Sequence, residues 1–527
     1  MTRFFPKPFK PSQVQRLHWL ALVGWLAGSQ SSLPLPWPAP AVAWLDLDTP
    51  ALQSALASGH VTAEAVTRQA LARIHDRDNS GPALNAIVTI NPDALSIARE
   101  LDRAFSLGGP MGPLHGLPVI LKANIDTGDT METTAGSLAL AGYVASDDAA
   151  LVKSLRDAGA VIIGKANLSE WANFRGDNSS SGWSSRGEQT RNPYVLNRNP
   201  CGSSSGSAVA VAARMTALAV GTETNDSIVC PAGTNGMVGI KPTQGSVPGD
   251  GIIPIAHTQD IAGPMATTVT GAALMLAVLQ GRPDDRALFE LDRDNLAGLR
   301  LGVIRDHYGA GQIQEVEALL QHWISLLEQD QAVIVDPINL AIPPGIGDNE
   351  LQVLLYEFKA DLNHYLQASG GPIRCLQELI VFNDSNAASV MPYYGQELFL
   401  AAQATSDLND PAYMQALSGS GDAMRILLDK VFDDQALDAL IAPTNSPAWV
   451  TDWVSGDHFG LSSSSPGAIS GYPSITVPGG LVHELPVGLT ILGRPGTEEL
   501  LVEIAGRFEA VRGGFPAPTF IPALEGP

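Results

Sequence analysis

The sequence predicts an α/β fold: a single large domain with a twisted, mostly parallel mixed central sheet flanked by helices, plus a helical cover. Between residues 117 and 240, short apolar runs bounded by Gly or Pro alternate with helix-length segments, as in strand–helix–strand units. Residues 313–435 carry mainly helical patterns, and residues 439–511 return to strands before one final helix. With 527 residues, 45% of them hydrophobic, the chain can bury one large core.

The first expected elements are helices at residues 61–76 and 92–105, the former with Thr62 as N-cap and Glu64 in its first turn. The alternating region is expected to contain, in order, strand 117–125, helix 147–158, strand 160–164, helix 207–215, strand 217–221, helix 227–235 and strand 237–240. Later elements are expected to be strands 299–304, 439–441, 474–477 and 487–491 and helices 354–367 and 497–511. The alternation predicts parallel pairing of the strands.

Charge and composition exclude several classes of partner and cofactor. The formal net charge is -23, whereas a surface that binds nucleic acid or an anionic membrane needs clustered Lys and Arg. The ten histidines show no metal-ligand spacing, so we expect no metal and no cofactor.

Three cysteines are too few for a disulfide framework. We expect Cys201 and Cys230 to be small buried side chains, since free cysteines are usually buried.

The N-terminus has the parts of an export signal. Four basic residues are interspersed over residues 3–16, the apolar run LHWLALVGWLA covers residues 17–27, and Ala41-Val42-Ala43 forms an A-x-A cleavage site. The apolar run is short for a membrane span, and four prolines at residues 34–40 stop a helix from extending it. We therefore expect a signal peptide at residues 1–43, followed by the catalytic body at 44–527. An uncleaved anchor and a disordered tail are the alternatives.

One lysine and two serines form a candidate catalytic set. Lys122 ends an apolar strand, Ser203 lies in CGSSSGS (residues 201–207), and Ser227 follows 24 residues later in GTETNDSIVCP (residues 221–231). No histidine is close to either serine in the sequence, so the available base is a lysine that burial keeps neutral. Each part also has a structural interpretation. Lys122 could pair with a carboxylate, Ser227 could cap a helix, and GSSSG could be a nucleophile elbow, an anion-binding helix start or a capped helix.

Taken together, the motifs of this chain resemble the amidase signature family, from about Leu45 to the last helix. Within the family the bacterial peptide amidases are most similar. The segments that carry the resemblance are KANI (122–125), NLSEWANFRG (167–176), GWSSRGEQTRNPY (182–194), PCGSSSGSAVAVAA (200–213), GTETNDSIVCPA (221–232), GMVGIKPT (236–243), DGIIPI (250–255) and LLYEFKA (354–360).

The resemblance implies the amidase signature fold and a Ser-Ser-Lys triad. Ser227 would be the nucleophile, Ser203 a bridging serine that follows a cis peptide bond, and Lys122 the base. The acyl-enzyme would form without a cofactor. The oxyanion would be bound by the backbone N–H groups of Thr224, Asn225, Asp226 and Ser227.

Three further residues bear on the expected activity and substrate binding. Asp226 stands where the family commonly has glycine, and a carboxylate there would oppose an oxyanion unless it points away. Asn173 and Arg175 are candidate substrate contacts, but they could equally hold a loop.

The sequence therefore predicts an exported, periplasmic or extracellular amidase that releases ammonia from a carboxamide, either a C-terminal peptide amide or a similar amide. We expect a monomer or homodimer without nucleic-acid partners or stable membrane association after signal cleavage. One alternative is the glutaminase-like subunit of a tRNA-dependent amidotransferase, which the export signal argues against. The other is a catalytically impaired binding protein of the same fold, suggested by Asp226.

Overall fold

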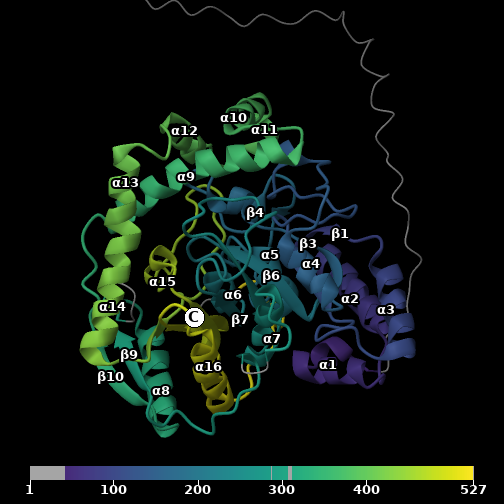
Figure 1. Cartoon of the computed structure of the whole chain (residues 1–527), viewed down its shortest axis with the longest axis horizontal. Helices are drawn as coiled ribbons and strands as arrows, with labels where there is room; N and C mark the ends of the chain where they lie inside the picture. The colour runs from purple at the N-terminus through teal and green to yellow at the C-terminus, as the bar shows by residue number, and fades with distance from the viewer. Residues whose placement is uncertain (1–41, 286–287, 307–310, 526–527) are drawn as a thin grey trace, which may run out of the picture. The chain divides into compact units, whose positions relative to one another are not determined.

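An eleven-stranded mixed sheet forms the centre of the protein, with helices packed against it (Figure 1). The computed structural model describes residues 42–285, 288–306 and 311–525, so the predicted signal segment lies outside the described residues apart from Val42 and Ala43. In spatial order the strands are β1 (Ile87–Ile90), β3 (Val161–Ala166), β2 (Pro118–Lys122), β6 (Leu218–Glu223), β8 (Ile261–Ala266), β7 (Val238–Lys241), β12 (Ser474–Val482), β13 (Leu485–Leu492), β11 (Ala439–Pro443), β9 (Arg300–Ile304) and β10 (Val333–Ile338). A separate ribbon pairs β4 (Trp183–Ser184) with β5 (Glu188–Gln189).

The strands fall into two parallel blocks joined by antiparallel pairs. β3, β2 and β6 run parallel to one another, as do β11, β9 and β10. The other neighbouring pairs are antiparallel. The predicted mixed α/β sheet is confirmed, and its parallel block β3–β2–β6 corresponds to the strand–helix alternation in the sequence.

In the described residues, α-helices lie before, between and after these strands. They are α1 (Thr49–Ala57), α2 (Ala63–Ile74), α3 (Ala94–Gly108), α4 (Ala150–Asp157), α5 (Ser205–Ala212), α6 (Val229–Thr234), α7 (Val269–Leu279), α8 (Gln314–Gln329), α9 (Ile346–Ser369), α10 (Leu376–Ser385), α11 (Ala387–Val390), α12 (Glu397–Ala404), α13 (Pro411–Leu417), α14 (Ala423–Gln435), α15 (Ser465–Ser470) and α16 (Glu498–Arg512). Thr62 caps α2, as predicted: its side chain accepts a hydrogen bond from the backbone N–H of Ala65.

The predicted helical cover is built around the long helix α9. In Figure 1, α9 crosses one side of the described body with α10, α11 and α12 beyond it, and α13 and α14 lie at its left end. α9 packs against α10, α12 and α13. Apolar residues of this cover, including Phe358 and Phe399, form a second core with the segment around Trp171, separate from the main core of the sheet.

Several elements differ from the sequence prediction, for physical reasons. β8 contains Gly263 and Pro264, which usually interrupt strands, and it lies antiparallel between β6 and β7. The predicted parallel pairing therefore does not extend to β7, although β6 and β7 run in the same direction. β10 interrupts the predicted helical region, and its Pro337 is tolerated because β10 is an edge strand. α7 is almost entirely buried, so it shows no polar face and no helical periodicity.

Within the described residues, none of the helices combines the length and the apolar character that a membrane crossing would require.

Candidate active site

Two parallel strands bring Lys122 and the segment of Ser227 to one edge of the sheet. Lys122 is the last residue of β2, and the neighbouring strand β6 ends at Glu223, just before the turn that leads to Ser227. The carboxyl ends of parallel strands meet at one sheet edge, so the segments that follow them converge. Ser203 reaches the same place from the loop before α5. Lys122 and Ser203 are fully buried, whereas Ser227 is 6% exposed.

The three predicted side chains form one continuous hydrogen-bonded chain. Lys122 Nζ donates to Ser203 Oγ at 2.7 Å, and Ser203 Oγ donates to Ser227 Oγ at 2.9 Å. The Gly202–Ser203 peptide bond is cis, as the family resemblance implies. Such a chain of hydroxyls ending on an amine can carry a proton away from the outermost serine.

Burial gives the Lys122 amine the character of a base. Loss of hydration lowers the pKa of Lys122 to about 7, and the nearby carboxylates of Asp260 and Glu223 only partly oppose this. Its other two contacts belong to Thr222, whose carbonyl oxygen and Oγ1 accept hydrogen bonds from Nζ at 3.0 and 2.9 Å. A neutral amine has two N–H groups and one lone pair. When Lys122 is neutral, its two N–H groups can stay on Thr222, and its lone pair can accept a hydrogen bond from Ser203 in place of the one that Nζ donates when protonated.

The turn before Ser227 forms with Asp226 in the left-handed region, at φ 70°. Aspartate adopts this conformation at a higher energetic cost than glycine, so neighbouring contacts must hold it in place. Asp226 Oδ2 accepts a hydrogen bond from Ser462 Oγ at 3.0 Å. Burial raises the pKa of Asp226 to about 7, and the negative charge of Glu223 adds to this effect. The carboxyl group is therefore partly protonated at neutral pH.

Side chains from distant elements hold Asn225, the preceding residue of the turn. Asn225 Nδ2 donates to Glu350 Oε1 on α9 at 2.8 Å, and Asn225 Oδ1 accepts from Ser464 Oγ at 2.6 Å. Gln259 Nε2 also donates to Glu350 Oε1 (3.0 Å) and to the carbonyl oxygen of Thr224 (3.2 Å). The helical cover thus braces the turn that leads to the nucleophile candidate.

Most of the predicted oxyanion donors are free. Among the described residues, the backbone N–H groups of Thr224, Asn225 and Ser227 donate no hydrogen bond to the protein. The exception is the Asp226 N–H, which interacts with the carboxylate of Glu223. The same carboxylate accepts hydrogen bonds from the backbone N–H groups of Ile228 (2.6 Å) and Val229 (3.0 Å) at the start of α6. Three of the four predicted amides therefore remain available to an anionic oxygen.

The two cysteines near the serines are joined, which corrects the prediction of separate buried side chains. Cys201 and Cys230 form a disulfide with a Cα–Cα distance of 6.0 Å. Both are fully buried, as expected, and Trp449 packs against them. Cys201 lies in the loop before α5 and Cys230 lies in α6, 29 residues later, and nothing in the local sequence shows that these segments meet.

Asn173 and Arg175 hold a loop. Arg175 is 1% exposed, forms an ion pair with the equally buried Glu170 (Nε to Oε2, 3.1 Å) and stacks over the ring of Tyr394 at 4.1 Å. Asn173 Nδ2 donates to Ser181 Oγ at 2.9 Å. Arg175 Nη1 and Nη2 are buried without a hydrogen-bond partner among the described residues. The ion pair and the ring contact nevertheless enclose the guanidinium, which favours the loop-holding alternative over direct substrate contact.

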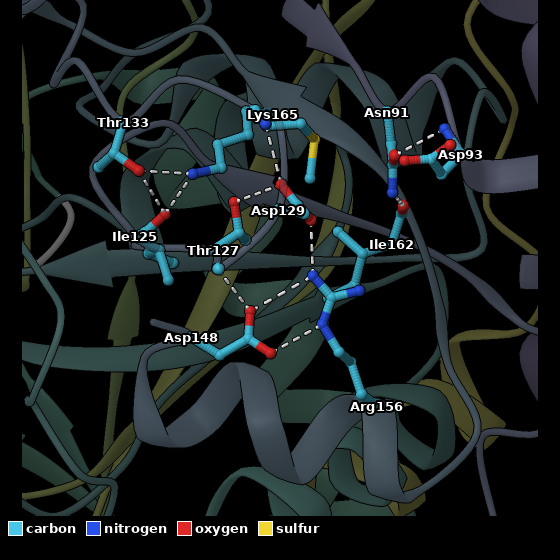
Figure 2. Close-up of polar contacts among 12 residues, drawn as sticks. Asn91, Asp93, Ile125, Thr127, Asp129, Thr133, Asp148, Arg156, Ile162 and Lys165 are labelled. Atoms are coloured by element: carbon cyan, nitrogen blue, oxygen red, sulfur yellow. Dashed lines mark hydrogen bonds and ion pairs between the residues drawn. The ribbon is translucent and has the colours of Figure 1, made fainter. Parts of the chain in front are cut away.

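A second buried lysine fixes the segment that follows Lys122. Figure 2 shows Lys165 Nζ donating to the carbonyl oxygen of Ile125 and to Thr133 Oγ1, both at 2.7 Å. Beside it, Arg156 bridges the carboxylates of Asp129 and Asp148 (Figure 2). These contacts tie both ends of the loop after β2 to its neighbours.

A cavity of about 620 Å³ lies beside the candidate site. Its wall includes Thr222, which contacts the lysine, and Thr224 of the turn, together with apolar side chains such as Ile253 and Ile261. Sequence reasoning missed the functions of Thr222, Glu350 and Ser462, because their contacts with the candidate residues arise only from tertiary folding.

One cluster in the described residues has the composition of a metal site. Ligand atoms of His257, Glu357 and Asp361 lie within 4.8 Å of one another. Each already has a protein partner, since His257 Nδ1 pairs with Asp361 at 2.8 Å and Glu357 accepts from Tyr413 and Thr258. The cluster is explained by these hydrogen bonds.

Comparison with known proteins establishes the class. The profile of the family described as Amidase matches residues 65–502, and the chain belongs to this family. It is an amide-hydrolysing enzyme with the amidase signature fold.

Three relatives illustrate the similarity. The crystal structure of native peptide amidase from Stenotrophomonas maltophilia is 43% identical, with a TM-score of 0.84 over 91% of this chain and 99% of that chain. A probable amidase of Arabidopsis thaliana is 39% identical over 81% of this chain and 83% of its own length. A glutamyl-tRNA(Gln) amidotransferase subunit of Symbiobacterium thermophilum is 34% identical over 86% and 94%, respectively.

Proposed function

We propose that this amidase hydrolyses the C-terminal amide of a peptide, or a similar carboxamide, to a carboxylate and ammonia through Lys122, Ser203 and Ser227. The observation that carries the proposal is the hydrogen-bonded chain of these three residues beside a turn with free backbone amides. The likeness to peptide amidase supports the substrate class. The adjoining cavity has room for part of a peptide, because ligand pockets are typically about 300–1,000 Å³.

Acylation begins when Ser227 Oγ attacks the amide carbonyl carbon. The hydroxyls rotate so that Ser227 gives its proton to Ser203 as Ser203 gives its own proton to neutral Lys122. The amide C–N bond then breaks, the same chain returns a proton to the nitrogen, and ammonia leaves. The products of this half-reaction are ammonia and an ester between Ser227 and the acyl group.

Deacylation repeats the sequence with water as the nucleophile. Water attacks the ester carbonyl, and its proton passes through the Ser203 hydroxyl to Lys122. Lys122 then returns a proton through Ser203 to Ser227 Oγ as the ester bond breaks, which frees the carboxylic acid product and restores the Ser227 hydroxyl. In both halves the carbonyl oxygen becomes anionic and is bound by the free amides of Thr224, Asn225 and Ser227. Loss of one such donor in comparable sites costs about 3–4 kcal/mol.

The geometry of Asp226 favours an active enzyme over an impaired binding protein. Its left-handed backbone leaves the turn formed, and its carboxyl group is bonded to Ser462. The raised pKa means that part of the population carries no charge next to the nascent oxyanion at neutral pH.

We also propose that the enzyme acts outside the cytoplasm. The N-terminal export pattern supports this, and so does the Cys201–Cys230 disulfide, because disulfides persist mainly in oxidising compartments.

The alternative role, as the glutaminase-like component of an amidotransferase, is favoured by the 34% identity to such a protein. The two functions differ in their substrates and in their need for partners. An amidotransferase component would release ammonia from glutamine and require further subunits, whereas the proposed enzyme acts alone on peptide amides.

The experiment is ammonia release by purified residues 44–527 from a peptide amide, from the matching free-acid peptide and from glutamine. We expect ammonia from the peptide amide only, with the peptide acid appearing in equal amount. Release from glutamine alone would contradict the proposal in favour of the amidotransferase role. No release from any amide, with activity gained in Asp226→Gly, would favour the impaired binding protein.

A further inference from the structure

The disulfide connects the loop of Ser203 to helix α6, which begins just after Ser227. Cys201 lies two residues before Ser203, and Cys230 lies three residues after Ser227 in α6. A direct backbone hydrogen bond, from Ser204 N to the carbonyl oxygen of Ser227, spans the same gap at 3.1 Å. The covalent link is therefore adjacent to the contact on which proton transfer between the two hydroxyls depends.

Each end of the disulfide is anchored in the backbone of its loop. Cys201 has a positive φ of 58°, a conformation that costs energy for any residue with a Cβ. Its N–H donates to Asn199 Oδ1 at 2.8 Å, and its carbonyl oxygen accepts from Ser205 Oγ at 2.5 Å. The Cys230 N–H donates to the carbonyl oxygen of Asp226 at 3.1 Å. A displacement of either sulfur would therefore move the backbone next to one of the serines.

We propose that the Cys201–Cys230 disulfide is a positioning element of the active site, which sets the separation of Ser203 and Ser227, so that oxidation of the two thiols is required for full activity. The proposal rests on the catalytic roles proposed above for the two serines. A hydrogen bond tolerates only a few tenths of an ångström, and displacements of about 1 Å in reacting groups can cost 10²-fold in rate.

The oxidation requires a disulfide donor, such as oxidised glutathione or a protein disulfide oxidase. The thiolate of one cysteine attacks the donor and forms a mixed disulfide, which releases one donor thiol. The second cysteine thiolate attacks the protein sulfur of that mixed disulfide and releases the second donor thiol. Two electrons pass from the cysteines to the donor, and both cysteine protons end on the two donor thiols.

The test compares oxidised wild-type protein with the double variant Cys201→Ala/Cys230→Ala, using Cys375→Ala as the matched control because Cys375 is the unpaired cysteine. For the double variant we expect kcat on a peptide amide to fall about ten- to hundredfold, whereas KM should change less than about threefold. The control should match wild type. Wild-type kcat in the double variant, with only a lower Tm, would overturn the proposal.

Two further measurements test the positioning role if the double variant does not fold or if wild type is inactive on peptide amides. If the double variant does not fold, wild-type protein is equilibrated in dithiothreitol buffers, and its disulfide content, circular dichroism and kcat are followed together. We expect kcat to fall with the disulfide content while the folded signal persists; full activity in the reduced protein, or loss only on unfolding, would overturn the proposal. If wild type hydrolyses no peptide amide, the proposed function fails, and the rate of Ser227 labelling by a fluorophosphonate decides the positioning role instead.

Discussion

Lys122 Nζ lies 2.7 Å from Ser203 Oγ, and the lysine's other two hydrogen bonds are both accepted by Thr222. In the proposed mechanism, this arrangement lets a site without a histidine activate a serine. Thr222 occupies two directions around the nitrogen and leaves the third for Ser203. Because burial lowers the pKa of Lys122 to about 7, the amine is available as a base near neutral pH.

The pH profile should report this lysine. We expect kcat/KM to fall about tenfold per pH unit well below pH 7, because protonated Lys122 has no lone pair to accept the Ser203 proton. Because the pKa of Lys122 is lowered to about 7, its neutral form dominates above that pH. Activity should therefore be lost as the pH falls through about 7. Steady-state kinetics from about pH 5 to 9 checks this, with circular dichroism to exclude unfolding. A flat profile between about pH 5 and 7 would contradict the assignment of Lys122 as the base.

Replacing Asp226 should increase activity at alkaline pH. The raised pKa of Asp226, about 7, means that its carboxyl group becomes charged as the pH rises through that value and then opposes the oxyanion. We expect Asp226→Asn to raise kcat/KM about three- to tenfold near pH 8.5 and to change it little near pH 6. Asparagine keeps an oxygen for the Ser462 hydroxyl and tolerates positive φ. Equal or lower activity under the alkaline condition would show that the charge has no such effect.

Glu350 should act on catalysis through the turn. In Glu350→Ala, the amide groups of Asn225 and Gln259 lose their shared acceptor, so the turn that leads to Ser227 loses a support from α9. We expect kcat to fall about tenfold and the free energy of unfolding to fall by about 1–2 kcal/mol. Glu350→Gln is the matched control, since it keeps an accepting oxygen and should retain most activity. If both variants keep wild-type kcat, Glu350 does not support the turn.

Arg175 should affect stability more than substrate binding. Its removal leaves Glu170 buried and without its ionic partner, and burial already raises the pKa of Glu170. We expect Arg175→Met to lower the free energy of unfolding by about 3–5 kcal/mol in denaturant titrations, and the folded fraction to keep its KM. Adding Glu170→Gln should restore part of the loss. A large increase in KM with unchanged stability would instead identify Arg175 as a substrate contact.

The sequence predicted most strongly those features that depend on local pattern. Buried strands such as β2 and β6 are short apolar runs, and Thr62 marks the start of α2, so both could be recognised from neighbouring residues. β8 and α7 were not recognised. The Gly and Pro of β8 resemble a loop, and α7 is buried on all sides and therefore shows no periodicity.

In the candidate site, too, some features follow from local sequence pattern and others only from the tertiary fold. Lys122, Ser203 and Ser227 stood out through motifs and spacing, and the structure brings them into contact. The Cys201–Cys230 disulfide and the contacts of Glu350 and Ser462 join segments that are far apart in the sequence or belong to different loops. Only the tertiary fold determines which of these distant side chains meet, so no local pattern could have revealed them.

The central claim is that Ser227 becomes acylated. The most direct measurement is mass spectrometry of the enzyme after rapid acid quenching during turnover of a peptide amide, with proteolysis to locate the added mass. The account predicts an acyl group on Ser227 in wild type and none in Ser227→Ala, which should release no ammonia above background. An acyl group on another residue, or full ammonia release by Ser227→Ala, would contradict it.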